Sequence, residues 1–225
     1  MSKLFYVIFF LMISLLGNSQ TRKEMTEQYL EGRDSGLADY VVLKSGQREE
    51  VKEFKLTESR KDFVANYYHD LVRYQTLNGE KRKMESSEVL RFQTKDYMGK
   101  LAKYNRNRSF GFIFGQGLAL RMSKGPLNVY RLYVYYKKNF ELDIEYQIIY
   151  FIEPAEDDLV EINMDSGILE KIEKLVEKSK NATALVEKVK AKSKKIFYDR
   201  TDLEYALVEA VQAYNKDAAE GNLGN

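Results

Sequence analysis

Residues Val129 to Lys138 read VYRLYVYYKK and place four tyrosines in ten positions. Tyrosine and valine are enriched in strands because they pack well on a pleated surface, and successive side chains of a strand point to opposite faces. The stretch therefore predicts a long β-strand. One face would carry Tyr130, Leu132, Val134 and Tyr136 toward the core, and the other would carry Val129, Arg131, Tyr133 and Tyr135.

The residues that follow predict a partner for this strand. From Ile144 to Ile152, every second position is isoleucine or tyrosine. If residues 137–142 close a hairpin, Tyr135 lies opposite Glu145 and Tyr133 lies opposite Gln147. The two apolar faces then point the same way, which makes this register self-consistent.

The outward residues of the hairpin form our candidate ligand-binding site. A phenol ring offers apolar area together with a hydroxyl donor, so a flat tyrosine platform edged by polar groups suits a sugar ring or a peptide. Cross-strand packing, or cover by the C-terminal helices, explains the same tyrosines without a ligand. Both interpretations stay open. The candidate residues are Arg131, Tyr133, Tyr135, Glu145 and Gln147.

Short strands are also predicted on both sides of this hairpin. Ser45-Gly46 and Asn78-Gly79 are turn signals, and Asn-Gly is the stronger because both residues tolerate positive φ. Many short strands separated by turns favour an antiparallel β-barrel or a strongly curled sheet. The strands are predicted at Tyr40 to Lys44, Val51 to Leu56, Leu71 to Gln75, Lys81 to Met84, Val89 to Thr94, Leu118 to Met122, Leu127 to Tyr136 and Leu159 to Asn163.

The pattern becomes helical after Asp165. Apolar residues recur at helical spacing from Ile168 to Val176, around Val186, and from Leu203 to Tyr214. The stretch from Thr201 to Glu204 fits a capping box, which predicts a helix start. We expect an α+β fold in which two or three C-terminal helices pack on the sheet, since a one-faced sheet needs a cover.

The first residues predict export. A basic MSK start is followed by the apolar run LFYVIFFLMISLLG and the small polar residues NSQ, as in a cleavable signal peptide. A spanning helix needs about twenty apolar residues, although a retained anchor is the alternative. We expect a periplasmic or extracellular protein. It has no cysteine, so its core alone must hold it together.

Five segments follow from these patterns. We expect a signal peptide at 1–19 and a polar segment with a candidate short helix at 20–36. One α+β domain would span 37–215, with a β-rich part at 37–164 and a helical part at 165–215. The chain would end in a flexible tail at 216–225.

The composition narrows the chemistry. The 36 basic and 34 acidic residues nearly balance, which argues against a polyanion-binding protein, nucleic-acid-binding proteins included. Without cysteine and with His69 as the one histidine, thiol catalysis and the usual zinc sites are disfavoured. No nucleotide-binding glycine motif is present. We expect neither a cofactor nor a metal.

Carboxylates leave one enzymatic alternative. Two acids that are neighbours in space can hydrolyse a glycosidic bond. The sequence does not identify which two of its 34 acidic residues would form such a pair. The cluster EPAEDD, Glu153 to Asp158, lacks the calcium-loop pattern and predicts an exposed turn.

Two further segments carry alternatives at the surface. RNRSFGFIFGQG, residues 106–117, fits a buried strand with glycine bulges, or a loop that dips into a membrane surface. Residues 166–195 hold nine lysines and four glutamates. They predict a solvated helix face, or a surface that touches anionic lipid or another acidic envelope polymer.

Several stretches together resemble uncharacterised exported proteins of Bacteroidota-type bacteria. They are the leader ending at Ser19-Gln20, DYVVLKSGQREEVKEFKL, SSEVLRFQ after the Asn-Gly hairpin, and the helical end containing ALVEKVKAKS. The resemblance implies an envelope location and a β-then-α layout, and it brings no catalytic residues. We therefore expect an exported, non-catalytic binding or structural protein, whose partner would be an envelope glycan, peptide or protein. The alternative is a paired-carboxylate hydrolase of envelope polysaccharide.

Overall fold

The structure is a computed structural model that describes residues 38–57, 71–108, 111–137, 144–154, 159–162, 167–193 and 200–224. These residues all belong to one compact unit, 31–225. His69 and the first 37 residues lie outside the described ranges. Among the described helices, none is both long and apolar enough to cross a membrane.

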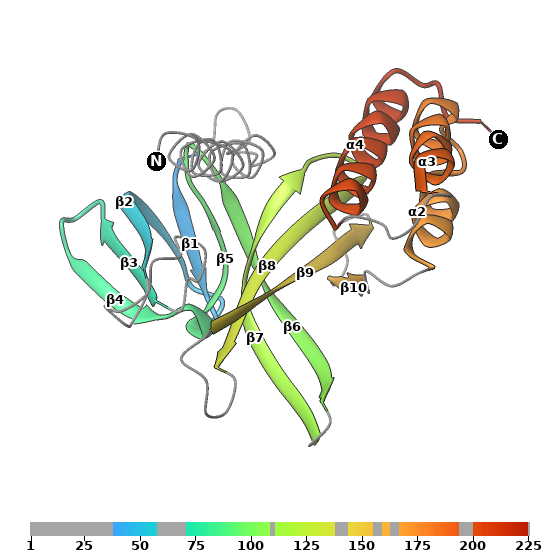
Figure 1. Cartoon of the computed structure of the whole chain (residues 1–225). Coiled ribbons are helices and arrows are strands. Elements are labelled where there is room, and N and C mark those ends of the chain that lie inside the picture. The colour runs from blue at the N-terminus through green and yellow to red at the C-terminus, as the bar shows by residue number, and fades with distance from the viewer. Residues whose placement is uncertain are drawn as a thin grey trace, which may run out of the picture. The chain divides into compact units, whose positions relative to one another are not determined.

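Ten strands form one antiparallel sheet (Figure 1), in the order β10-β9-β8-β7-β6-β5-β1-β2-β3-β4. β10 and β4 are its two edges, so the sheet is open and the barrel alternative is wrong. The predicted α+β class is confirmed. The strands are β1 (Tyr40–Leu43), β2 (Arg48–Thr57), β3 (Leu71–Thr76), β4 (Lys81–Glu85), β5 (Val89–Gln93), β6 (Met98–Arg108), β7 (Gly111–Ser123), β8 (Leu127–Lys137), β9 (Ile144–Pro154) and β10 (Val160–Ile162).

The predicted turn signals close the first hairpins. Gly46 and Gly79 have φ values of 85° and 87°, a region that glycine reaches without steric cost. Strand β6 was not predicted, because its polar residues interrupt the apolar alternation. It pairs with β7 in an unbroken register from Gly99↔Leu120 to Arg108↔Gly111. The segment 106–117 thus belongs to a hairpin, and no glycine bulge interrupts the described pairs.

The predicted register of β8 and β9 is wrong by one residue. Tyr133 pairs with Ile148 and Tyr135 with Tyr146, whereas Gln147 pairs with Val134 and Glu145 with Tyr136. The strands are joined by residues 138–143 where 137–142 were expected, the same length displaced by one residue, and a one-residue slip exchanges every partner. Where their side chains are described, both faces of these strands are covered. Neighbours such as Tyr130 and Arg131 are each only 2% exposed.

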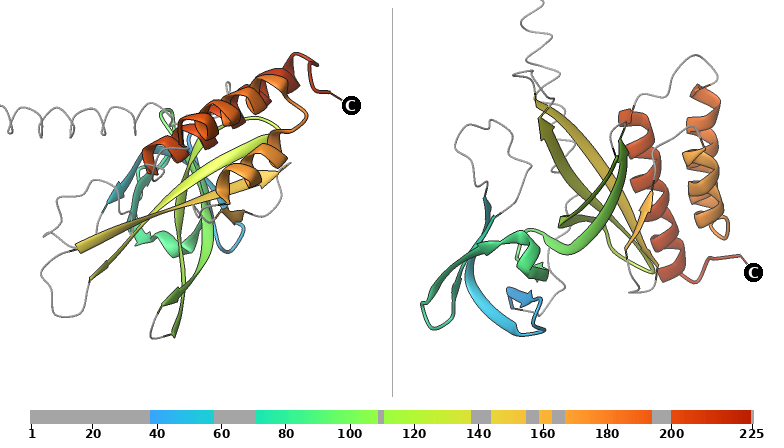
Figure 2. Two further views of the ribbon diagram at one scale, coloured as in Figure 1. Left: turned by 45° about the vertical axis from the view of Figure 1, so that its right-hand side comes forward. Right: turned by 90° about the horizontal axis from the view of Figure 1, so that it is seen from below.

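Three helices follow the sheet, as expected: α2 (Ile168–Val176), α3 (Lys180–Ser193) and α4 (Arg200–Ala219). α4 contacts β7 and β8 on one side and α2 and α3 on the other, and the three helices lie together beside these strands in Figures 1 and 2. Leu207 and Val211 are fully buried in this layer.

The end of the chain differs from the predicted tail. α4 continues past Lys216 to Ala219, and the Asp217 carboxylate accepts hydrogen bonds from Ser179 and Asn181 at 2.5 and 2.8 Å. Gly224 N–H donates to the Lys178 carbonyl at 2.8 Å. The last described residues are therefore bonded to the start of α3.

Candidate functional site

Arg131 belongs to the interface between sheet and helices. Its NH1 donates to Glu204 Oε1 of α4 at 2.6 Å, and the two side chains are 2% and 19% exposed. Arg131 is therefore not part of an exposed platform, and Glu204, expected to cap a helix, neutralises it. The other four predicted site residues have side chains that the structure does not describe: Tyr133, Tyr135, Glu145 and Gln147.

A buried polar cluster lies on the other face of the same strands, and Glu153 is its centre. The Glu153 carboxylate accepts hydrogen bonds from Lys100 Nζ at 2.6 Å, Tyr130 OH at 2.7 Å and Asn128 Nδ2 at 3.1 Å. Glu153 is 5% exposed, so the exposed turn predicted for this residue is wrong. Every donor at this carboxylate comes from a different side chain, which fixes its position.

The contact between Lys100 and Glu153 requires the sheet to curve toward this face. Lys100 lies on β6 and Glu153 on β9, with β7 and β8 between them. Three strand intervals span about 14 Å in a flat sheet, which the two side chains can close only where the strands bend together. Burial and the bond to Glu153 raise the pKa of Tyr130, which the charge of Arg121 partly opposes. Tyr130 therefore keeps its proton and remains a donor.

The polar face continues across β5, β1 and β2. Tyr40 pairs with Gln93, while Val42 pairs with both Arg91 and Arg48, so alternation puts the four polar residues on one face. Arg91 also pairs with Lys100 of the cluster. The Arg48 guanidinium stacks 4.2 Å above the Tyr40 ring, which leaves its edge donors directed away from the ring. We call Arg48, Tyr40, Arg91 and Gln93 the Gln93 site.

Gln93 contains an unused donor. Its side chain is 1% exposed, and its Nε2 makes no hydrogen bond within the described part of the chain. A buried donor without a partner costs about 1–3 kcal/mol. Arg91 is exposed two residues earlier on the same face. The amide of Gln93 and the guanidinium groups of Arg91 and Arg48 thus lie on one face of the sheet, and carboxylates and phosphates match guanidinium geometry best.

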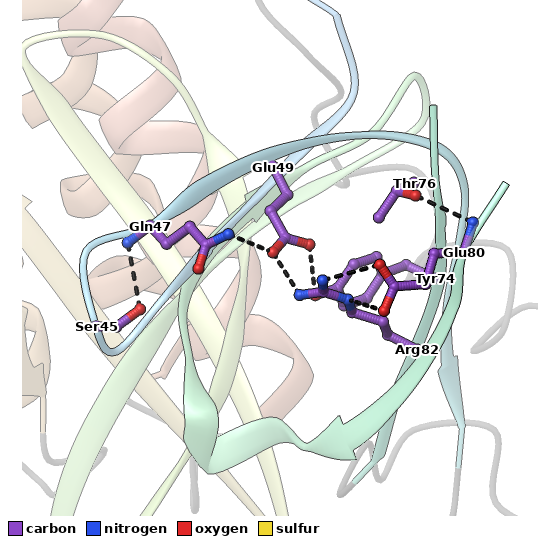
Figure 3. A network of polar contacts seen from close by, with 7 residues as sticks. All are labelled: Ser45, Gln47, Glu49, Tyr74, Thr76, Glu80 and Arg82. Carbon is purple, nitrogen blue, oxygen red and sulfur yellow. Dashed lines mark hydrogen bonds and ion pairs between the residues drawn. The ribbon is translucent and has the colours of Figure 1, made fainter. Parts of the chain in front are cut away.

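The opposite face of β1–β4 carries a second polar network, drawn in Figure 3. Glu49 accepts from Arg82 NH1 at 2.5 Å, Tyr74 OH at 2.9 Å and Gln47 Nε2 at 2.9 Å. Arg82 also binds both oxygens of Glu80, at 3.1 and 3.0 Å. Burial and the bond to Glu49 raise the pKa of Tyr74 to about 12. The network joins three strands, β2, β3 and β4.

The same network bears on paired-carboxylate chemistry. Glu49 and Glu80 meet at one guanidinium, and hydrogen bonding to Arg82 lowers the pKa of Glu80. A general acid needs a raised pKa to hold its proton at neutral pH. The lowered pKa makes Glu80 unsuited to the general-acid role in a glycosidase.

Gln93 and Glu153 were not among the site residues predicted from the sequence, for different reasons. Glu153 continues the alternation of Ile149 and Phe151, which signalled a strand position, but its acidic neighbours suggested a turn. Gln93 carries no local signal, since its missing partner is visible only in three dimensions. In the described ranges, no three His, Cys, Asp or Glu side chains gather as metal ligands would.

Comparison with protein-family models, curated proteins and solved structures found no match. The functional proposal therefore depends on the geometry of the Gln93 site.

Proposed function

We propose that this chain is an exported, non-catalytic binding protein of the bacterial cell envelope that holds an acidic ligand at the Gln93 site. The leader-like start supports export. The ligand's anionic group, a carboxylate, would lie between Gln93 Nε2 and the guanidinium groups of Arg48 and Arg91. An envelope glycan or peptide that carries carboxylates would supply it.

The unused donor of Gln93 is the observation that supports this proposal most. Buried polar groups are almost always hydrogen-bonded, so an orphan amide on the same face as two cations points to an acceptor that binds there. Hydrogen bonds from charged donors to a carboxylate are about twice as strong as neutral ones. The bound ligand would therefore satisfy Gln93 and balance the charge of Arg48 and Arg91 together.

Titration calorimetry with a galacturonate oligosaccharide, a glutamate-rich peptide and a neutral glucan tests the proposal. We expect an acidic probe to bind, the glucan not to bind, and Gln93→Leu to weaken binding about tenfold or more. The same substitution should not lower the melting temperature, because it removes an unsatisfied donor. Gln116→Leu, on an exposed position of β7, is the matched control.

Two results would contradict the proposal. Equal affinity of wild type and Gln93→Leu for the acidic probe would remove the site. Intact-mass analysis that finds the natural protein in the cytosol with Met1 retained would remove export. Hydrolysis of the glycan probe by the wild type would instead favour the paired-carboxylate alternative.

A further inference from the structure

Three basic residues lie side by side on strands β2, β3 and β4. Lys55 pairs with Arg73, and Arg73 pairs with Lys83, so directly opposed side chains on one face form a row of cations. All three are exposed. We call Lys55, Arg73 and Lys83 the basic ladder.

The ladder is held in an outward orientation by the residues between its members. Tyr74 and Arg82, which alternate with Arg73 and Lys83, take part in the network of Figure 3 on the opposite face. Tyr74 is 3% exposed. Because side chains alternate along a strand, anchoring these two residues directs the ladder away from the network.

No carboxylate in the described ranges is ion-paired with the ladder, although Glu53 lies two residues before Lys55 on the same face of β2. None of the ion pairs in the described ranges includes Lys55, Arg73 or Lys83. Glu85 flanks the ladder but accepts a hydrogen bond from Ser87 at 3.3 Å. Like charges placed directly opposite each other on neighbouring strands repel. An anionic surface that covers the ladder would relieve this repulsion.

An apolar side chain accompanies these cations. Leu77, in the turn of the β3–β4 hairpin, is 48% exposed, and Lys81 follows at the start of β4. A lipid interface accepts an apolar side chain and attracts cations with its headgroups. A soluble acidic polymer would neutralise the cations but would gain nothing from Leu77. The combination therefore favours a lipid surface.

We propose that the β3–β4 hairpin and the basic ladder dock this protein on an anionic phospholipid surface. The ladder would contact the phosphate headgroups while Leu77 enters the interface. This surface is distinct from the Gln93 site. The two share only β2, which contributes Arg48 at its start to that site and Lys55 near its end to the ladder, and their other residues lie on β1 and β5 and on β3 and β4. The docking would not depend on the acidic ligand.

Vesicle flotation tests the proposal with vesicles of phosphatidylcholine alone and of phosphatidylcholine mixed with phosphatidylglycerol. The full chain is used, and the measured quantity is the ratio of affinities for the two vesicles. The apolar N-terminal stretch is common to all variants, so it contributes equally to both measurements. We expect a strong preference of the wild type for anionic vesicles.

The variants locate the surface. Each lost cation should reduce the preference about fivefold, so K55S/R73S/K83S should lose on the order of a hundredfold. K174S/K178S/K188S removes the same charge from exposed positions of the helical region and should leave the preference unchanged. Leu77→Ser should weaken binding to anionic vesicles about fivefold or more. Unchanged melting temperatures would show that the variants are folded.

Three results would overturn the proposal. The wild type could bind both vesicles equally, or the helix variant could lose as much preference as the ladder variant. Binding of soluble polyglutamate as tight as that of anionic vesicles, with Leu77→Ser without effect, would assign the ladder to an acidic polymer instead.

Discussion

The ion pair between Arg131 and Glu204 should be a major support of the contact between α4 and the sheet. Glu204→Ala removes the carboxylate that binds Arg131 NH1 at 2.6 Å and leaves a guanidinium that is 2% exposed. Removing one partner of a buried pair costs about 3–5 kcal/mol. Because Glu204 is itself 19% exposed, water can partly replace it, and we expect about 3 kcal/mol.

This loss is large enough to measure by thermal unfolding. For a domain of this size, 1 kcal/mol shifts the melting temperature by about 2–4 °C, so Glu204→Ala should melt about 6–12 °C lower, as followed by far-ultraviolet circular dichroism. Replacing both residues with apolar ones of similar volume, R131M/E204L, should restore most of the stability.

A second ion pair provides the control. Lys190 Nζ lies at the same 2.6 Å from Glu173 Oε2, but both side chains are more exposed, at 22% and 32%. Solvent and salt screen such a pair, so Glu173→Ala should leave the melting temperature nearly unchanged. If Glu204→Ala and Glu173→Ala melt alike, or if R131M/E204L is no more stable than Glu204→Ala, burial does not set the strength of the Arg131 pair.

Three further outcomes are expected. The pKa of Tyr74 is raised to about 12 in the folded chain, so its stabilising contribution is complete below pH 10 and is lost as the pH rises through about 12. Tyr74→Phe should therefore flatten this part of the alkaline unfolding profile. An identical profile would contradict the raised pKa of Tyr74. Hydrogen bonds from Ser179 and Asn181 lower the pKa of Asp217, so its contribution is present above about pH 4 and falls as the pH drops through the lowered pKa; Asp217→Asn, titrated with urea at several pH values, should remove that dependence. Gly99→Ala should lower the free energy of unfolding by about 1–3 kcal/mol, because its Cβ would lie 2.5 Å from Phe92 Cε1 and 2.9 Å from a backbone oxygen. The Cβ of Gly117→Ala, the control, meets only a flexible leucine. Equal urea midpoints for the two variants would refute this prediction.

The order and type of the main elements follow from local patterns. Alternation along 127–136 and 144–152, the turns at Gly46 and Gly79, and the helical spacing after Asp165 predicted elements that the structure contains. Strand β6 was not predicted because its polar residues interrupt the two-residue alternation of a strand, although it pairs with β5 on one edge and β7 on the other. Such patterns depend on steric preferences of residues that are close in the chain, and these can be read from the sequence.

The tertiary structure decided which residues meet. The β8–β9 register became visible only in the paired strands, and only the curvature of the sheet brought Lys100 to Glu153. The near balance of 36 basic and 34 acidic residues likewise concealed Lys55, Arg73 and Lys83 aligned on one face. Pairing between distant strands depends on loop closure and on burial from both faces, and these terms involve residues far apart in the chain. For that physical reason the sequence by itself determined most of the elements, while the fold alone determined the sites.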